Sequence, residues 1–463
     1  MTRTREGSPD RTPADRAHHT LTDRTPADRA HHTPTDHTPT DHTPAYRMLD
    51  APSLIDLLAG LADLRPLLGP RPDDWRVSEV GDGNLNLVFI VEGPRGSVCV
   101  KQAVPYVRVA GPSWPIPLER AYFEHSYYAA VAPFVGNLIP KIHHYDPDLY
   151  CIVMERLSPH IIVRHGLIAG RRYPNLAHDM GEYVARACFF TSDLASAFEG
   201  KMDGIARFAG NTALMRISVD LIFRDPYIAA ERNRHTSPQL DAIVADLRRD
   251  GSLKAAAARF GQKFLTETQS LIHGDLHSGS VMVSENDTRV IDPEFAFYGP
   301  MGFDLGAFFG NLLLSWYSQP GHATSNDDRL GYQEWILDQA RIFWETFRGR
   351  FLALWAGHAA GDAWPAAMFS APGDLAALES ARSAYVNSLF ADMLGFAACK
   401  MIRRILGFAH VIDFERIQDA DRRGRCEANA LALAHLLLTQ PGQFRSVSDV
   451  IDAVPRIGGG RGR

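Results

Sequence analysis

The stretch that decides the fold spans residues 270–300 and has the sequence SLIHGDLHSGSVMVSENDTRVIDPEFAFYGP. It contains two short runs of β-forming residues, VMV and RVI, joined by polar turn residues, which predicts a hairpin. Asp275 precedes the hairpin and Asp292 follows it, seventeen residues later. Because a hairpin returns the chain beside its own start, we expect both carboxylates to face one cleft.

Two acids placed in this way suit phosphoryl transfer. Asp275, in the motif HGDLH, can orient a hydroxyl group and accept its proton, while Asp292 and Glu294, in DPE, can hold Mg²⁺ against nucleotide phosphates. A buried hydrogen-bond network of His and Asp is the alternative interpretation. The spacing of the two motifs favours phosphoryl transfer.

The region before this stretch predicts a small antiparallel sheet. Residues 75–80 and 97–102 alternate as strands do, 87–92 is a run of β-forming residues, and a Gly-rich turn, Gly81-Asp82-Gly83-Asn84, separates the first two segments. Such a turn can direct backbone N–H groups at phosphates, although ordinary hairpins also use it.

Two charged residues extend the predicted nucleotide site. Lys101 lies on the third strand and can contact the α- and β-phosphates. Glu124 lies on a helix expected at about 117–132, and it can either pair with Lys101 or remain a surface charge.

The order of these patterns predicts an α+β fold with two lobes. A small antiparallel β lobe is expected at 48–157, ending in the buried strand and polar exit LYCIVMERL at 149–157. A large, mainly helical lobe is expected at 158–447, followed by a C-terminal tail at 448–463.

The first 47 residues differ from the rest in composition. Residues 11–23 and 24–36 form a 13-residue tandem repeat rich in Pro, Thr, Asp, Arg and His. Because these residues have little apolar surface to bury, we expect the segment 1–47 to be disordered.

Composition excludes several classes of protein. A hydrophobic content of 45% with 22% charged residues is typical of a folded globular chain. The net charge of −6 argues against a nucleic-acid partner and against a polybasic membrane patch, and no apolar run is long enough for a transmembrane helix. Five scattered cysteines without a CxxC pair argue against a disulfide framework and indicate a reducing cytoplasm.

The full order of motifs resembles a known superfamily. A Gly-rich turn, a strand lysine, a helix glutamate, HGDxH and DxE resemble the protein-kinase-like fold, and HGDLH is similar to its aminoglycoside phosphotransferase and choline kinase branch. Longer stretches resemble the S-methyl-5-thioribose kinase family: GDGNLNLVFIV, VKQAVPYVR, GPSWPIPLERA, IHGDLHSGSVMV, VIDPEFAFYGPMGFDLGAFFGNLLL and KMIRRILGFAHVIDFE.

This resemblance implies ATP-dependent phosphorylation of the anomeric hydroxyl of S-methyl-5-thioribose in methionine salvage, by a homodimer that uses Mg²⁺. Asp275 would be the catalytic acid and would bind the sugar together with Arg403 and Arg404, while Asp292 and Glu294 would bind the metal. The residues expected to contact ATP are Asn84, Lys101, Glu155, Arg156, Leu157, Asp292, Pro293 and Glu294.

Within these expected sites, three features stay open. Adjacent helical residues point roughly 100° apart, so at most one of Arg403 and Arg404 is expected to face the sugar; the alternative is a solvated pair with a salt partner such as Glu415. Trp114, in the loop 113–115 and beside two prolines, can shield the cleft from water or serve as a packing anchor. Ser280 stands where related kinases place a metal-binding Asn, so metal binding should depend on the two acids after the hairpin.

Two other functions remain as alternatives. A kinase of aminoglycosides or choline would need acids to hold a cationic substrate, whereas the substrate-side candidates here are arginines. A scaffolding pseudokinase would be expected to lack Lys101, Asp275 or Asp292, and all three are present.

Overall fold

The computed structural model describes residues 46–81, 85–108, 111–358 and 360–458. The chain divides into two units, Met1–Pro44 and Ala45–Arg463. The repeat segment and Asn84 of the Gly-rich turn lie outside the described residues, so the expectations for them remain predictions.

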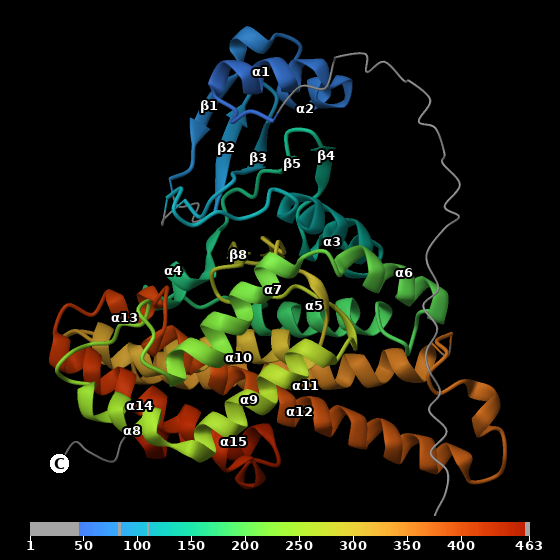
Figure 1. Ribbon diagram of the computed structural model, residues 1–463. Helices are drawn as coiled ribbons and strands as arrows, with labels where there is room; N and C mark the ends of the chain where they lie inside the picture. The colour runs from blue at the N-terminus through green and yellow to red at the C-terminus, as the bar shows by residue number, and fades with distance from the viewer. Residues whose placement is uncertain (1–45, 82–84, 109–110, 359, 459–463) are drawn as a thin grey trace, which may run out of the picture. The chain divides into compact units, whose positions relative to one another are not determined.

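The predicted small antiparallel sheet is confirmed. It has five strands in the order β1-β2-β3-β5-β4, every neighbouring pair antiparallel. Helix α1 lies at one end of this sheet and α3 at the other (Figure 1). The elements are α1 (Ala51–Gly60), α2 (Arg65–Leu68), β1 (Arg76–Glu79), β2 (Asn86–Glu92), β3 (Ser97–Ala103), α3 (Arg120–Val135), β4 (Ile142–Asp146) and β5 (Cys151–Glu155).

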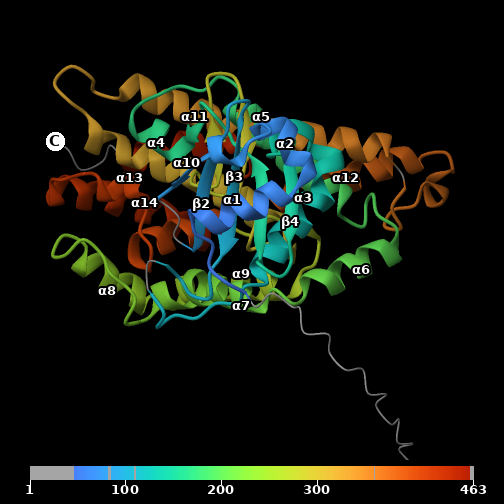
Figure 2. The ribbon, with the colours of Figure 1, turned by 90° about the horizontal axis from the view of Figure 1, so that it is seen from above.

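Most of the remaining chain is helical, as predicted. In Figure 2, turned by 90°, strands β2 to β4 and α1 overlie these helices. The helices are α4 (Val163–Ile168), α5 (Leu176–Phe190), α6 (Phe198–Phe208), α7 (Thr212–Ser218), α8 (Asp241–Arg249), α9 (Gly251–Thr266), α10 (Met301–His322), α11 (Leu330–Gly357), α12 (Asp374–Leu406), α13 (Ile412–Glu415), α14 (Ala420–Thr439) and α15 (Val447–Gly458). Within the described ranges, no helix has the length and apolarity needed to cross a bilayer.

Helix α15 occupies most of the segment predicted as a C-terminal tail. Val447, Val450 and Val454 recur at helical spacing and are buried, so this segment has an apolar face to bury. The hydroxyl of Tyr317 also donates a hydrogen bond to the Val454 carbonyl, at 3.2 Å. The helix is thus part of the folded unit.

The predicted hairpin after Asp275 is present. Strand β8 pairs antiparallel with β9, and the Ser284 N–H donates to the Asp287 carbonyl at 2.9 Å to close the turn. The short strands of this region are β6 (Ile161–Ile162), β7 (Ser270–Ile272), β8 (Val281–Val283), β9 (Thr288–Val290) and β10 (Phe297–Gly299).

Helices α10 and α12 pack with their backbones close together. Three glycines of α10 recur every four residues, at Gly302, Gly306 and Gly310. A Cβ atom at Gly306 would lie 2.6 Å from the Ala397 nitrogen, and one at Gly302 would lie 2.5 Å from the Asp392 Cβ. Glycine at these positions therefore sets the separation between α10 and the helix that carries Arg403 and Arg404.

Candidate active site

The loop that contains Asp275 is attached to the start of α10. The Asp304 carboxylate accepts the N–H groups of His273 at 2.6 Å and Gly274 at 3.0 Å. Gly274 has a φ of +83°, and a Cβ atom there would lie 2.2 Å from the Phe295 carbonyl oxygen. Only glycine fits this conformation and this space, which explains the central residue of the HGD motif.

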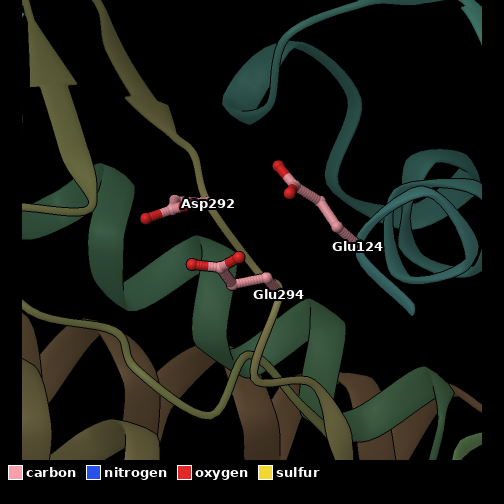
Figure 3. Close-up of side chains that lie close together, drawn as sticks. All are labelled: Glu124, Asp292 and Glu294. Atoms are coloured by element: carbon pink, nitrogen blue, oxygen red, sulfur yellow. The ribbon is translucent and has the colours of Figure 1, made fainter. Parts of the chain in front are cut away.

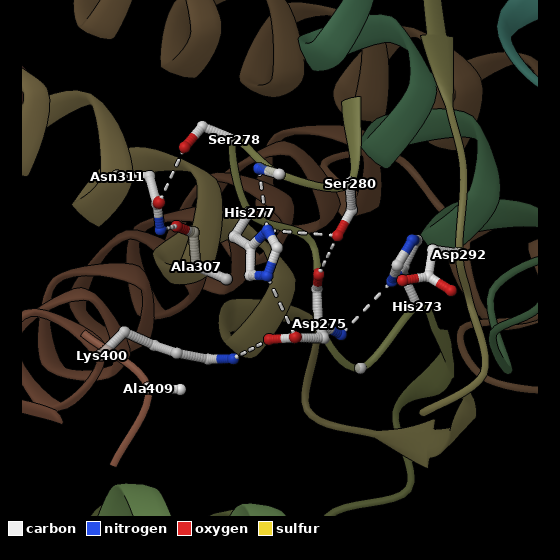
Figure 4. Close-up of polar contacts among 12 residues, drawn as sticks. His273, Asp275, His277, Ser278, Ser280, Asp292, Ala307, Asn311, Lys400 and Ala409 are labelled. Carbon is white, nitrogen blue, oxygen red and sulfur yellow. Dashed lines mark hydrogen bonds and ion pairs between the residues drawn. The ribbon is translucent and has the colours of Figure 1, made fainter. Parts of the chain in front are cut away.

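Two side chains fix the carboxylate of Asp275, as Figure 4 shows. The ammonium group of Lys400, on α12, lies 2.9 Å from Oδ1, and Nε2 of His277 lies 3.3 Å from Oδ2. Nδ1 of His277 accepts the Gly279 N–H at 2.9 Å, so the ring proton belongs on Nε2, which donates to Asp275.

The charges around Asp275 keep it ionised. Burial by itself would raise the pKa of this carboxyl, but the positive charge of Lys400, followed by the effects of His277 and Arg404, holds the pKa well below its usual range. Burial lowers the pKa of His277 to about 3, against the opposing charge of Asp275, so the imidazole is neutral. Asp275 is therefore a carboxylate held by one cation and one neutral donor.

The two adjacent arginines of α12 converge on one carbonyl group. Nη1 of Arg404 lies 3.1 Å from the Ala409 oxygen, and Nη1 of Arg403 lies 3.5 Å from it. Arg404 is buried and Arg403 is half-buried, so they are not a solvated pair. Their suggested salt partner, Glu415, instead contacts Arg234 and His410.

Of the two alternatives for Glu124, the ion pair with Lys101 is the one that forms, with 2.6 Å between Nζ and Oε2. The same ammonium group contacts the Asp292 carboxylate. Asp292 has a φ of +70°, which is uncommon for a residue other than glycine, and its N–H donates to the Tyr128 hydroxyl at 3.0 Å. Strained backbone of this kind is concentrated at functional sites.

Glu294 is buried and held by two partners. Nε of Arg120 lies 3.2 Å from its carboxylate, and Nδ2 of Asn86 donates to it at 3.0 Å. Pro293, between the two acids, is buried, and its carbonyl accepts the Ala296 N–H at 3.1 Å, which turns the chain after Asp292.

Three carboxylates share this part of the site. Glu124 projects from α3 toward the loop that carries Asp292 and Glu294 (Figure 3). One oxygen of each lies within 4.8 Å of the others. Burial raises the pKa of Glu124 and of Glu294, and the nearby negative charge of Asp292 adds to the effect. A set of carboxylate oxygens at this separation is the kind of ligand set that Mg²⁺ accepts.

The segment expected to contact adenine begins at Glu155, the last residue of β5. The Glu155 N–H donates to the Lys141 carbonyl at 2.8 Å, so this N–H group already has a partner within the chain. The side chain of Arg156 pairs with Glu92 on β2. These residues are half-buried.

The loop carrying Trp114 reaches the end of α12. The Trp114 ring lies 5.4 Å from that of Phe408, and the Arg232 guanidinium lies 5.2 Å from the Trp114 ring centroid. Trp114 is half-buried and thus combines packing with a position near the paired arginines.

The Ser280 hydroxyl is engaged within the catalytic loop. It donates to the Asp275 carbonyl at 2.9 Å and lies 3.2 Å from Nδ1 of His277. This side chain therefore stabilises the loop that contains Asp275.

Motif-based reasoning missed three contributors to the site: Lys400, Asp304 and Arg120. Lys400 precedes Arg404 by one helical turn, so helical spacing placed it on the same face and was the available signal. Asp304 follows the DPE motif in the stretch PMGFDLG, but its partners are backbone N–H groups, which no side-chain pattern reveals. Arg120 contacts a residue far away in the sequence, and only the tertiary fold brings the two together.

Comparisons with known proteins agree with this geometry. Residues 76–364, more than half of the chain, match the phosphotransferase enzyme family. The chain is 45% identical to methylthioribose kinase of Escherichia coli over 386 residues, which are 83% of this chain and 92% of the relative. It is 44% identical to methylthioribose kinase 1 of Oryza sativa subsp. japonica over 409 residues, 88% of this chain and 94% of the relative. The chain therefore belongs to the methylthioribose kinase family.

Proposed function

We propose that this chain transfers the γ-phosphoryl group of ATP to the anomeric hydroxyl of S-methyl-5-thioribose, as a step of methionine salvage. Family membership supports the substrate, and one observation supports the reaction: His273 bonds both to the Asp275 N–H and to the Ile291 carbonyl, and so links the Lys400-paired Asp275 to the three clustered carboxylates that include Asp292. Phosphoryl transfer needs a group that orients the hydroxyl and a second group of residues that holds the metal and the nucleotide.

On the acceptor side, Asp275 accepts a hydrogen bond from the attacking hydroxyl and orients its oxygen toward phosphorus. Arg403 and Arg404, on the same side of the site, bind the sugar, and at most one of these adjacent helical residues faces it directly. The positive charges close to Asp275 disfavour aminoglycosides and choline, which are cationic, and this supports a neutral sugar as the substrate.

On the nucleotide side, Lys101 binds the phosphates, and Asp292 and Glu294 hold Mg²⁺, with Glu124 as a third carboxylate within reach. The metal, when bound, neutralises phosphate charge. Asn84 contacts ATP from the Gly-rich turn, while Glu155, Arg156 and Leu157 line the adenine end and Pro293 holds the two metal ligands in place.

The proposal extends to location and assembly: a cytoplasmic homodimer. All five thiols are free, and four of them are buried, which suits a reducing compartment. The homodimer rests on the family resemblance.

The test is a substrate panel. The full-length chain with Mg²⁺ and ATP is incubated with methylthioribose, kanamycin or choline, ADP release is measured, and the product is identified by phosphorus NMR. We expect turnover with methylthioribose alone and a phosphate on the anomeric oxygen. Phosphorylation of kanamycin or choline, with none of methylthioribose, would refute the proposal.

A further inference from the structure

Lys400 is a buried ammonium group in direct contact with the catalytic carboxylate. Its side chain is 4% exposed, its Nζ lies 2.9 Å from Oδ1 of Asp275, and it lies 4.4 Å from the centroid of the Phe303 ring. Burial of a charged amine is costly unless a partner compensates for the lost hydration. The contact with Asp275 supplies that compensation and ties the lysine to the acid.

We propose that Lys400 is a positioning residue for phosphoryl transfer: it fixes the orientation of the Asp275 carboxylate and keeps it ionised while the acceptor hydroxyl attacks. This inference rests on the role proposed above for Asp275. Lys400 acts through that carboxylate and does not contact the reacting atoms.

The geometry leaves room for the acceptor. Lys400 occupies one lone-pair direction of Oδ1 and His277 occupies one of Oδ2, whereas a carboxylate offers about four. A substrate hydroxyl can therefore donate to a remaining position of a carboxylate whose plane is already fixed on both sides.

This arrangement also sets when the proton moves. As the sugar oxygen forms its bond to the γ-phosphorus, the bond from phosphorus to the β,γ-bridging oxygen breaks, and ADP leaves with that electron pair. The hydroxyl proton passes to Asp275 and from there to water. A carboxylate stabilised by Lys400 is a weak base, so its proton transfer follows bond formation to phosphorus, as a loose transition state allows.

Other charged groups surround Asp275 but do not replace Lys400. From α12, Arg403 and Arg404 add positive charge, and both bond to the Ala409 carbonyl. Arg164 of α4 is opposed by Asp413 of α13, 3.6 Å away.

The remaining titratable groups near the loop have other partners. Asp304 of α10 accepts two backbone N–H groups, Nε2 of His273 bonds to the Ile291 carbonyl, and His277 is neutral. Loss of the Lys400 charge would therefore raise the proton affinity of Asp275.

The experiment compares Lys400→Met, Lys400→Arg and, as a matched control, Lys263→Met. Lys263 is also paired with an acid of α12, Asp392, at 2.9 Å, but it does not contact Asp275. For each full-length variant, kcat and KM are measured across pH with saturating Mg²⁺ and ATP and varied methylthioribose, and folding is checked by thermal melting. Lys400→Gln replaces Lys400→Met if the latter does not fold.

We expect Lys400→Met to lower kcat by about 10–100-fold, the loss of one charged hydrogen bond, and to move the acidic limb of kcat/KM to higher pH. Lys400→Arg should keep that limb in place, and Lys263→Met should match the wild type. An unmoved limb in a folded Lys400→Met protein would overturn the proposal.

A double-mutant cycle separates this inference from the role of Asp275. In an Asp275→Asn background, Lys400→Met should cost less than about 3-fold, because its target is already lost. If the two losses simply multiply, Lys400 does not act through Asp275. If Asp275→Asn alone retains full activity, the proposed function of Asp275 fails instead.

Discussion

The two halves of the site have opposite charge balance. Around Asp275, one catalytic carboxylate faces the cations of α12, and its pKa is held well below its usual range. Around Lys101, three carboxylates lie close together, its ammonium group contacts those of Glu124 and Asp292, and burial raises the pKa of Glu124 and Glu294. The same chemical group is thus tuned in opposite directions within one site. An acid that must remain an anion lies among cations, whereas acids that can receive a metal lie together.

The largest expected effect comes from removing the acceptor-side charge. Asp275→Asn keeps the shape but loses the charge that orients the hydroxyl, so kcat should fall by about 10²–10⁴. Binding of a non-hydrolysable ATP analogue with Mg²⁺, measured by calorimetry, should remain within about 3-fold of the wild type. Loss of nucleotide binding in this variant would contradict the assignment of Asp275 to the acceptor side of the site.

The corresponding change on the nucleotide side should act on binding. Asp292→Asn removes a metal ligand, so the Kd for the analogue with Mg²⁺ should rise by about 10–100-fold, the scale of one charged contact. Raising Mg²⁺ should recover part of the activity. Intact nucleotide binding here, together with its loss in Asp275→Asn, would show that the two roles are reversed.

The next prediction uses pH to compare the two halves. A raised pKa means that a carboxyl gains its proton at a higher pH, and a lowered pKa means that it stays charged to a lower pH. As pH falls, Glu294 should therefore protonate before Asp275. The acidic limb of kcat/KM for ATP should lie at higher pH than that of kcat/KM for methylthioribose measured at saturating ATP.

Glu294→Gln is the control for that profile. It removes one of the two carboxyls whose pKa burial raises, so the limb for ATP should change while the limb for methylthioribose stays in place. Coincident limbs in the wild-type protein would contradict the opposite tuning of the two halves.

The smallest expected effects distinguish the two arginines. Arg404 is buried and Arg403 is half-buried, with the longer bond to Ala409. Arg403→Gln should change KM for methylthioribose by only a few-fold and leave the melting temperature unchanged, whereas Arg404→Gln should also lower stability by roughly 0.5–3 kcal/mol, since the Arg404 side chain is buried and its packing would be lost. Equal melting temperatures for the two variants would contradict this ranking.

The elements and side chains that lie within short local motifs could be predicted from the sequence. The short distance in sequence between Asp275 and Asp292 predicts the hairpin between them. Lys101 and Glu124 lie on consecutive predicted elements, a strand and the next helix, which made their contact a possible one. Lys400 was not recognised, because its partner lies 125 residues away and only the packing of α12 brings the two together. Helix α15 was also missed, since its apolar face is short and follows a turn. The contact of Lys400 with Asp275 thus depends on long-range packing, which local sequence periodicity does not reveal.

The glycines at every fourth position of α10 have a consequence for how the site responds to change. The distance from Asp275 to the cations of α12 is set by backbone meeting backbone, through Gly302 and Gly306, and not by flexible side chains. One added methyl group at Gly306 would push α12 away from α10, and every acceptor-side cation would shift with it. A natural homologue with alanine at position 306 would lose activity although every motif named above is present. Motif comparison alone would therefore wrongly classify such a homologue as active.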